Sequence, residues 1–154
     1  DFSRKDSSTL NTLCQAFADG NAEEAQKQFT AFLRKTISIR DTYVKAAKKE
    51  NFYHGLLLGL LRSIADWKIL SNAEAGEGFS DILIEPRRNL NMGIVIEIKY
   101  APTFRALDEA CAKAMEQIKA RGYDERLRED GREDILAYGI AFNKKRCKAV
   151  CERL

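Results

Sequence analysis

A chain of 154 residues is long enough to bury one substantial core and too short for two domains of comfortable size. Its balance of 45% hydrophobic and 32% charged residues is that of an ordinary folded protein, which excludes a disordered or fibrous chain. A formal net charge of +3 is too small to predict a nucleic-acid partner unless basic residues gather on one surface.

The cysteines and the apolar segments indicate where such a chain would reside. Four cysteines are too sparse for a secreted disulfide framework, and no second cysteine pair or histidine cluster completes a zinc site. Reduced thiols in the cytoplasm are the simplest interpretation. The most apolar run, 55–61, falls well short of a membrane span, so we expect no membrane contact. Because the chain begins at Asp1 rather than at a methionine, we expect a piece of a longer protein.

Two helices are predicted at the start of the chain. Apolar residues recur at helical spacing from 8 to 19, and Gly20 ends that pattern. Asn21 is a good N-cap with Glu24 three residues later, so a second helix should follow. We therefore expect residues 1–46 to form a helical hairpin or linker without chemistry, and residues 47–154 to form the functional domain.

A third helix is predicted from about 50 to 67. It is apolar nearly all round, which predicts that it packs against a sheet. Glu50 and His54 lie one turn apart on one face of this helix. A short strand at 68–70 and an acidic, glycine-bearing loop at 72–78 should follow.

The next stretch, 78–100, has the pattern of two apolar strands joined by a polar turn. Alternation with a period of two sends Ile98 to one face and its neighbours Glu97 and Lys99 to the other. A turn centred near Asn89 would bring Asp81 opposite or diagonal to that pair. Buried charge is costly unless it has a use, so we expect two carboxylates and an amine to converge here.

The remaining elements complete the sheet. A helix at 105–121 should end at Gly122, and 127–134 should be a short helix or loop. The almost continuous apolar run 135–143 predicts a strand covered on both faces, with an edge strand at 146–151. This order of elements predicts an α/β fold in which a mixed sheet is flanked by helices.

The charged residues of the hairpin suit a metal site. Mg²⁺ or Mn²⁺ takes oxygen ligands, usually one or two carboxylates with waters, and Asp81 and Glu97 could supply them. Lys99 beside them could orient or deprotonate a water, and Glu50 could hold a further water or a second metal. The alternatives are a salt-bridge cluster on a solvated sheet face and, for Glu50, an interaction with its helix dipole.

In this order the residues resemble the PD-(D/E)XK nuclease superfamily, which has a restriction-endonuclease-like fold. Asp81 stands at the position of the aspartate motif, although Ser80 precedes it where proline is common. Glu97-Ile98-Lys99 is similar to the (D/E)XK tripeptide. The resemblance implies that the backbone carbonyl of Ile98 joins Asp81 and Glu97 as a metal ligand.

Three further residues extend the resemblance. Glu50 looks like the acidic residue that many members carry on the first core helix. Gln117 and Tyr123 look like the glutamine and tyrosine of the helix after the catalytic hairpin, although a surface amide and a core-edge ring are the ordinary alternatives. Residues 50–142 are also similar to the nuclease-like domain at the C-terminal end of bacterial proteins that begin with an AAA-ATPase-like domain.

The resemblance implies hydrolysis of phosphodiester bonds, which we expect to be those of DNA, with Mg²⁺ or Mn²⁺ as cofactor. The implied catalytic residues are Asp81, Glu97, Lys99, Glu50 and Gln117. An AAA-ATPase-like domain in the full-length protein and a second copy of the chain are the implied protein partners. One alternative is a catalytically silent domain that binds or regulates an attached ATPase, and another is a purely structural domain.

A second group of residues is expected to contact nucleic acid, because basic side chains near an active cleft hold a phosphate backbone. Its members are Tyr123, His54, Arg87, Arg88, Lys144 and Lys145. The ordinary alternatives are a solvated face for the basic run and a structural role for His54.

Overall fold

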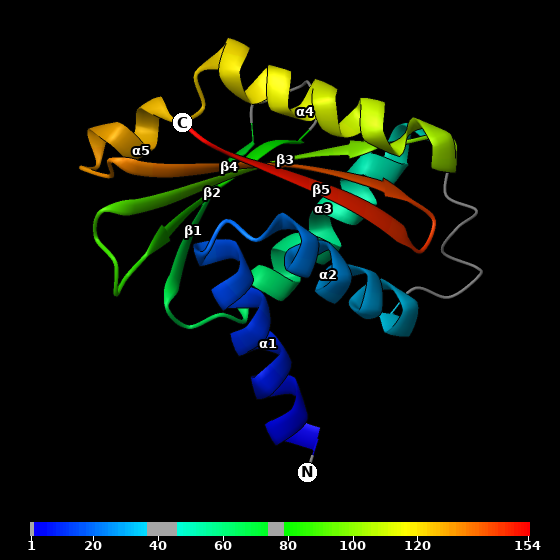
Figure 1. Ribbon diagram of the computed structural model, residues 1–154, viewed down its shortest axis with the longest axis horizontal. Coiled ribbons are helices and arrows are strands. Elements are labelled where there is room, and N and C mark those ends of the chain that lie inside the picture. Colours follow the sequence, from blue (N-terminus) through cyan, green and yellow to red (C-terminus); the bar gives the residue numbers. More distant parts are fainter. Residues whose placement is uncertain (1, 37–45, 74–78) are drawn as a thin grey trace.

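The computed structural model describes residues 2–36, 46–73 and 79–154, with side chains for 8–36, 49–70 and 82–154 (Figure 1). Over these residues the chain forms five α-helices and five strands, with a short 3₁₀-helix, η2, before α4. The helices are α1 (Phe2–Ala18), α2 (Ala22–Thr36), α3 (Ala46–Arg62), η2 (Phe104–Ala106), α4 (Leu107–Arg121) and α5 (Glu125–Glu129). The strands are β1 (Trp67–Ala73), β2 (Phe79–Pro86), β3 (Met92–Tyr100), β4 (Asp134–Asn143) and β5 (Arg146–Arg153).

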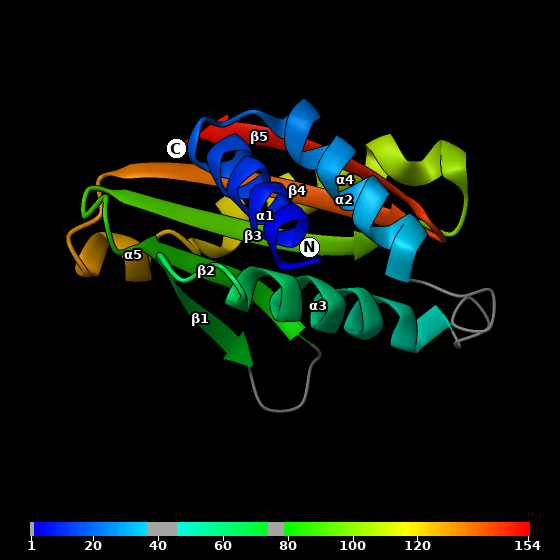
Figure 2. The same cartoon turned by 90° about the horizontal axis from the view of Figure 1, so that it is seen from below.

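One five-stranded sheet runs through the molecule in the order β1-β2-β3-β4-β5. Only β3 and β4 pair in parallel, and the other three neighbours are antiparallel. Because parallel neighbours need a crossover, the chain between them forms α4 and α5 on one face of the sheet, while α1, α2 and α3 cover the other (Figures 1 and 2). The predicted α/β fold with a mixed sheet flanked by helices is confirmed.

The larger core lies between the sheet and the first three helices. Phe17 of α1 is fully buried, with ring centroids 5.5 Å from Phe29 of α2, 5.8 Å from Trp67 and 4.6 Å from Tyr138 of β4. The Tyr138 hydroxyl also donates a hydrogen bond of 2.6 Å to the Phe17 carbonyl. The two leading helices are therefore packed directly against the sheet.

The smaller core lies under α4 and α5. Leu83 and Val95 from the hairpin meet Met115 and Ile118 of α4 and Leu127 of α5 there. The isoleucines at alternate positions of β3 point instead into the larger core. The predicted alternation of β3 is confirmed, and it places the side of the strand that carries Glu97 and Lys99 toward α4.

The ends of several elements differ from expectation. The third helix stops at Arg62 rather than near Trp67, because the chain turns at Ser63–Ile64 and Trp67 begins β1 opposite Pro86. The Asn21 cap is confirmed by a 3.1 Å hydrogen bond from the Glu24 amide to its Oδ1. Residues 37–45 of the expected hairpin segment and 74–78 of the expected loop lie outside the described residues.

Two further features concern the whole chain. The four cysteines are free thiols. Over the part of the chain that the structure describes, no helix combines the length and the apolar character that crossing a membrane requires.

Candidate active site

The register of the β2–β3 hairpin determines which residues can meet. Ile84 pairs with Ile94 and Ile82 with Ile96, so the pairs are symmetric about Asn89. This is the turn centre that the sequence predicted. Asp81 and Glu97 are the next residues along the two strands, although the side chain of Asp81 lies outside the described part of the structure.

Three of the predicted catalytic side chains come together at the end of β3. The Lys99 Nζ lies 3.6 Å from Oε1 of Glu97 and 3.9 Å from Oε1 of Glu50, which α3 contributes from a distant part of the sequence. The Glu97 side chain is 2% exposed, that of Lys99 26% and that of Glu50 46%. The exposure of the side chains therefore increases across the cluster, from the buried Glu97 to the partly exposed Glu50.

These distances describe an ammonium held between two carboxylates. Separations of 3.6 and 3.9 Å are those of ion pairs and exceed hydrogen-bond length. Ile98, between the two charged residues, is buried in the larger core, so only its backbone lies between them. The arrangement can orient the amine while its solvent-facing side stays open to a water or an anionic oxygen.

The oxygen donors of this cluster fit a divalent metal of the Mg²⁺ type. Within the described side chains no group of three acidic, histidine or cysteine residues forms a ready cage. Mg²⁺ does not require one, because it usually keeps several waters and takes one or two carboxylates. Glu97 and Glu50 supply carboxylates against one amine, and Asp81 is the next residue beyond the paired part of β2. Glu97 and Glu50 are therefore the described residues that could hold such an ion, and the role of Asp81 stays a prediction.

Gln117 and Tyr123 are joined to each other at the C-terminal end of α4. The Gln117 Nε2 donates a 3.2 Å hydrogen bond to the Tyr123 hydroxyl, which also accepts one of 3.2 Å from Arg121. Among the described contacts, the hydrogen bond of Gln117 goes to Tyr123 rather than to Glu97 or Lys99. The glutamine and the tyrosine therefore contact each other, and the role of Gln117 at the Lys99 cluster stays a prediction.

Arg87 and Arg88 lie at the other end of the hairpin. Arg87 donates a 2.6 Å hydrogen bond to the carbonyl of residue 65, and Arg88 forms an ion pair of 3.8 Å with Asp66. The strand from Met92 to Lys99 spans seven residue steps, which is about 23 Å. The structure does not bring these arginines to the Lys99 cluster.

Lys144 and Lys145 do lie at the Lys99 end. They form the turn between β4 and β5, and Figure 2 shows this turn beside the end of β3 and the start of α4. The carbonyl of Lys144 accepts a 2.5 Å hydrogen bond from the Tyr53 hydroxyl of α3. His54, the next residue on that helix, is only 4% exposed and cannot reach a nucleic acid from this position.

A glycine that we did not predict controls how closely α4 approaches Glu97. Gly139 pairs with Glu97 across β3 and β4, and a Cβ atom on it would lie 2.7 Å from the backbone oxygen of Cys111. Any larger residue would push α4 away from this part of the sheet. The signal was available, because a glycine within a continuous apolar strand marks a close backbone approach.

A lysine and a tyrosine next to the cluster were also missed. The Lys49 Nζ donates a 2.9 Å hydrogen bond to the Tyr100 hydroxyl and lies 4.7 Å from the centre of that ring. They are the immediate neighbours of Glu50 and Lys99 in sequence. This contact ties the start of α3 to the end of β3, and so helps to position the two carboxylates around Lys99.

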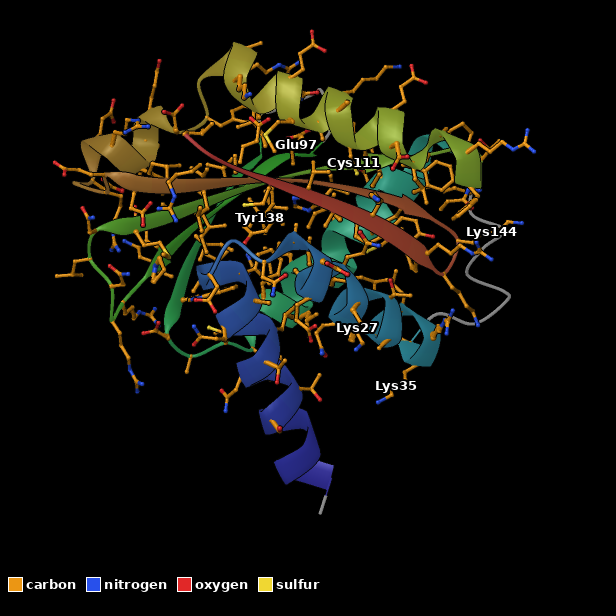
Figure 3. All side chains as sticks on the ribbon, viewed as in Figure 1. Lys27, Lys35, Glu97, Cys111, Tyr138 and Lys144 are labelled. Carbon is orange, nitrogen blue, oxygen red and sulfur yellow. The ribbon has the colours of Figure 1, made fainter. Side chains whose placement is uncertain are left out.

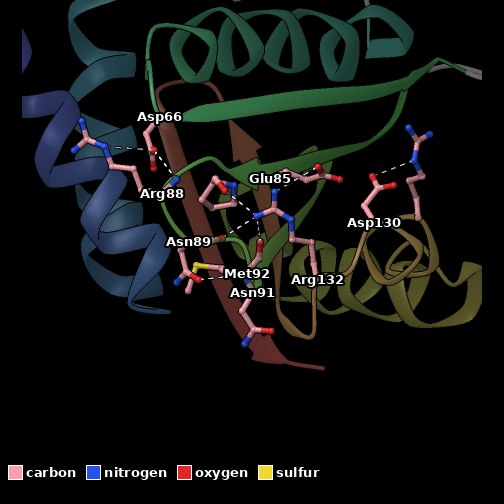
Figure 4. Close-up of polar contacts among 10 residues, drawn as sticks. Asp66, Glu85, Arg88, Asn89, Asn91, Met92, Asp130 and Arg132 are labelled. Atoms are coloured by element: carbon pink, nitrogen blue, oxygen red, sulfur yellow. Dashed lines mark hydrogen bonds and ion pairs between the residues drawn. The ribbon is translucent and has the colours of Figure 1, made fainter.

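A second buried glutamate, Glu85, lies on the same hairpin at the Asn89 end (Figure 4). Arg132 lies 3.7 Å from it and donates hydrogen bonds of 2.7 to 3.1 Å to the carbonyls of Pro86, Asn89 and Met92. Burial, and then a hydrogen bond with Asp130, raises the pKa of Glu85 above its ordinary value. This cluster holds the hairpin turn through interactions within the protein.

The family assignment agrees with this geometry. A model of the PD-(D/E)XK nuclease superfamily matches residues 48–152, which include Glu50, the whole β2–β3 hairpin and every element to the last strand. The chain belongs to the PD-(D/E)XK nuclease superfamily. Members of this superfamily are typically enzymes, and they typically use divalent metals. A search of curated proteins finds no match to the chain.

Proposed function

We propose that this domain hydrolyses phosphodiester bonds of DNA in a reaction that depends on Mg²⁺ or Mn²⁺. The observation that carries the proposal is the position of Lys99, whose Nζ lies 3.6 Å from Glu97 and 3.9 Å from Glu50 at an open end of the sheet. The match to the PD-(D/E)XK nuclease superfamily supports it, because Glu97 and Lys99 form the tripeptide for which the superfamily is named.

In this proposal the metal-holding groups are Asp81, Glu97 and the backbone carbonyl of Ile98. A bound divalent ion polarises a phosphoryl oxygen and lowers the pKa of a coordinated water. Glu50, which is 46% exposed, would hold a further water at the rim of the site or a second ion. The burial of Glu97 supports its role as the inner ligand, since a carboxylate at 2% exposure holds a fixed position.

Lys99 would position the attacking water and stabilise charge on the phosphate. An ammonium group has three N–H donors, and the two carboxylates lie at ion-pair distances that exceed hydrogen-bond length. A donor would therefore be available for a water or a phosphate oxygen, and the 26% exposure of the side chain leaves room for either. The two flanking carboxylates would keep the amine aimed at that point.

Gln117 is proposed to complete the site from α4. Its hydrogen bond to Tyr123 supports a positioning role, because that bond fixes the amide in one orientation. Tyr123 would in turn serve as a positioning residue for Gln117, or contact the nucleic acid directly from the end of the helix.

One observation favours a second candidate function. Lys99 already has two carboxylate partners within the protein, as expected for a domain that has kept the fold and lost catalysis. Such a domain would act as a binding or regulatory module for an attached AAA-ATPase-like domain or for a second copy of itself.

Cleavage of supercoiled plasmid DNA with Mg²⁺ or Mn²⁺ tests the proposal. We expect nicking or cutting by the unaltered protein, and its loss in Asp81→Ala and in Lys99→Ala. Lys113→Ala is the matched control, because Lys113 is also paired with a glutamate, at 3.3 Å, but lies on the exposed side of α4. Full activity in both site variants would overturn the proposal. Failure to cleave any nucleic acid, with binding that a chelator does not change, would favour the regulatory module.

A further inference from the structure

An exposed aromatic ring lies near the proposed active site. Phe104, in η2 between β3 and α4, is 58% exposed, and among the described residues the other exposed large apolar side chain is that of Leu90. A single exposed apolar residue is common and does not by itself indicate a binding site. Phe104 differs from Leu90, however, because a basic side chain lies against its ring.

The Phe104 ring lies against one cation, and both residues of this contact belong to basic segments of the sequence. The Arg146 guanidinium carbon lies 4.5 Å from the centre of the ring. Arg105 follows Phe104, Lys144 and Lys145 precede Arg146, and segments 102–107 and 143–148 contain no acidic residue. Asp108, the next residue after the first segment, forms an ion pair with Lys148. Phe104 is therefore an exposed apolar ring that contacts one cation and belongs to a basic segment of the sequence.

Backbone and side-chain hydrogen bonds connect the segment before this ring to the Lys99 end of the sheet. The Ala101 amide donates a 2.8 Å hydrogen bond to the Phe142 carbonyl, and the Asn143 side chain donates one of 2.8 Å to the Ala101 carbonyl. These bonds hold the end of β3 against the end of β4, where Figure 3 labels Lys144. Five residue steps separate Lys99 from Phe104, so their Cα atoms are at most about 18 Å apart.

We infer that Phe104 and Arg146 form a stacking platform for an unpaired base, and that the substrate enters this end of the site as single-stranded DNA. The inference rests on the proposed nuclease function, because it names the form of DNA that the same site takes. In a duplex each base is stacked on its neighbours, so only an unpaired or terminal base can lie on an external ring. Aromatic rings and arginine guanidinium planes provide such stacking surfaces, while lysines and arginines hold the backbone.

The chemistry of this surface favours a nucleic-acid strand over a protein partner. A protein interface would present several apolar side chains at its centre with charges depleted there. Phe104 shows the reverse, because its ring is exposed and lies against the Arg146 guanidinium. Arg105, Lys144 and Lys145 are close neighbours of these two residues in sequence. A strand with one phosphate per nucleotide and a planar base complements that pattern.

Binding measured in a chelator tests the inference without requiring cleavage. Fluorescein-labelled single-stranded DNA and the blunt-ended duplex that it forms with its complement would be titrated with the unaltered protein and three variants, in EDTA, by fluorescence anisotropy. We expect Phe104→Ala to weaken binding of the single strand roughly 5- to 150-fold and that of the duplex by less than about twofold, since stacking requires an unpaired base. Phe104→Trp should retain the affinity.

Leu90→Ala is the matched control, because Leu90 is 72% exposed and lies in the turn at the opposite end of the hairpin. It should bind both forms of DNA as the unaltered protein does. Equal weakening of both forms by Phe104→Ala, no weakening of the single strand, or no binding of the single strand by the unaltered protein would each overturn the inference.

The two proposals fail in different ways. If the unaltered protein cuts no DNA with Mg²⁺ or Mn²⁺, the proposed function fails, whereas the anisotropy titration still decides the stacking platform. If it cuts DNA and Phe104→Ala binds the single strand normally, only the stacking platform fails.

Discussion

The β2–β3 hairpin carries a buried glutamate near each of its ends, and the two have different surroundings. Glu85 is 4% exposed and Glu97 is 2% exposed, and both lie on the side of the sheet that faces α4 and α5. The guanidinium partner of Glu85 is Arg132, whose side chain is 9% exposed. The ammonium partner of Glu97 is Lys99, whose side chain is 26% exposed.

This difference distinguishes a structural charge cluster from one that can serve a ligand. Moving a carboxylate out of water costs several kcal/mol, and that cost must be offset at both positions. At Glu85 the offset comes from an arginine that three backbone carbonyls hold in place, all within the protein. At Glu97 it comes from a lysine that still reaches solvent, so a water or a phosphate can join the cluster. Burial alone does not distinguish the structural glutamate from the one that can serve a ligand, because the two are almost equally buried.

The largest effect that we expect comes from neutralising one glutamate at a time. Glu97→Gln should lower metal-dependent cleavage of DNA by at least about 100-fold, because the amide holds a divalent ion poorly and the metal supplies several kcal/mol to the transition state. Glu85→Gln should leave the cleavage rate within about twofold of the unaltered protein, because it changes no group at the Lys99 end. Plasmid-nicking rates of the two variants check this, and equal losses would remove the functional distinction between the two ends.

The second effect concerns stability at the Asn89 end. Arg132→Met should lower the free energy of unfolding by about 3–5 kcal/mol, since it leaves Glu85 buried without its cation and three carbonyls without their donor. Arg128→Met is the control, because Arg128 is 44% exposed and its ion pair with Asp124 should contribute less than about 1 kcal/mol. Urea denaturation measures both. Similar values for the two variants would show that the Arg132 cluster does not stabilise the turn.

The third effect tests the close packing beside Glu97. Gly139→Ala should cost about 1–3 kcal/mol, because the new Cβ would meet the Cys111 oxygen at 2.7 Å and α4 would have to move. Gly55→Ala on α3 is the control. Beyond its own helix backbone, a Cβ added there would meet no atom of the described residues within 4 Å, so alanine should stabilise the helix by about 0.5–1 kcal/mol. Thermal unfolding in parallel decides the matter, and a stable Gly139→Ala variant would contradict the packing described here.

The smallest effect is the pH dependence of the Glu85 end. Burial and a hydrogen bond with Asp130 raise the pKa of Glu85, and the charges of Arg132 and Lys68 only partly oppose this. Folded Glu85 therefore retains its proton to higher pH than the unfolded chain does. Its contribution to stability is fully present below the unfolded value of about 4.3 and is lost as pH rises through the folded pKa.

The stability of the unaltered protein relative to Glu85→Gln should accordingly fall as pH rises above about 4.3, and then level off. The glutamine amide can still donate to Asp130, so the difference between the two proteins isolates the carboxyl group. Urea denaturation at a series of pH values gives this difference. A difference that is constant, or that rises with pH, would show that Glu85 does not titrate as its surroundings indicate.

Regular local patterns made part of this structure predictable from sequence. Alternation along β3 predicted the faces of Ile98 and Glu97, and the polar turn predicted a register centred on Asn89, which the pairing of Ile84 with Ile94 confirms. Gly122 ends α4 in the left-handed conformation, with a φ of 61°. Each of these features depends on residues that are close in sequence.

The features that sequence did not reveal depend on contacts between distant segments. Arg132 meets the hairpin turn only because the chain returns after α5, some 40 residues later. The burial of Glu85 depends on the same return. Gln117 was expected at the metal site, whereas its described hydrogen bond is to Tyr123 just beyond the end of its own helix. These contacts arise from tertiary packing, which residue periodicity does not encode.

Isothermal titration of Mn²⁺ into the unaltered protein, Glu97→Gln and Glu85→Gln tests most directly whether the two glutamates differ in function. The measurement requires neither a nucleic-acid substrate nor turnover. We expect the unaltered protein and Glu85→Gln to bind Mn²⁺ with the same affinity, and Glu97→Gln to lose that binding. Binding by Glu97→Gln as tight as that of the unaltered protein would contradict the assignment of Glu97 as a metal ligand.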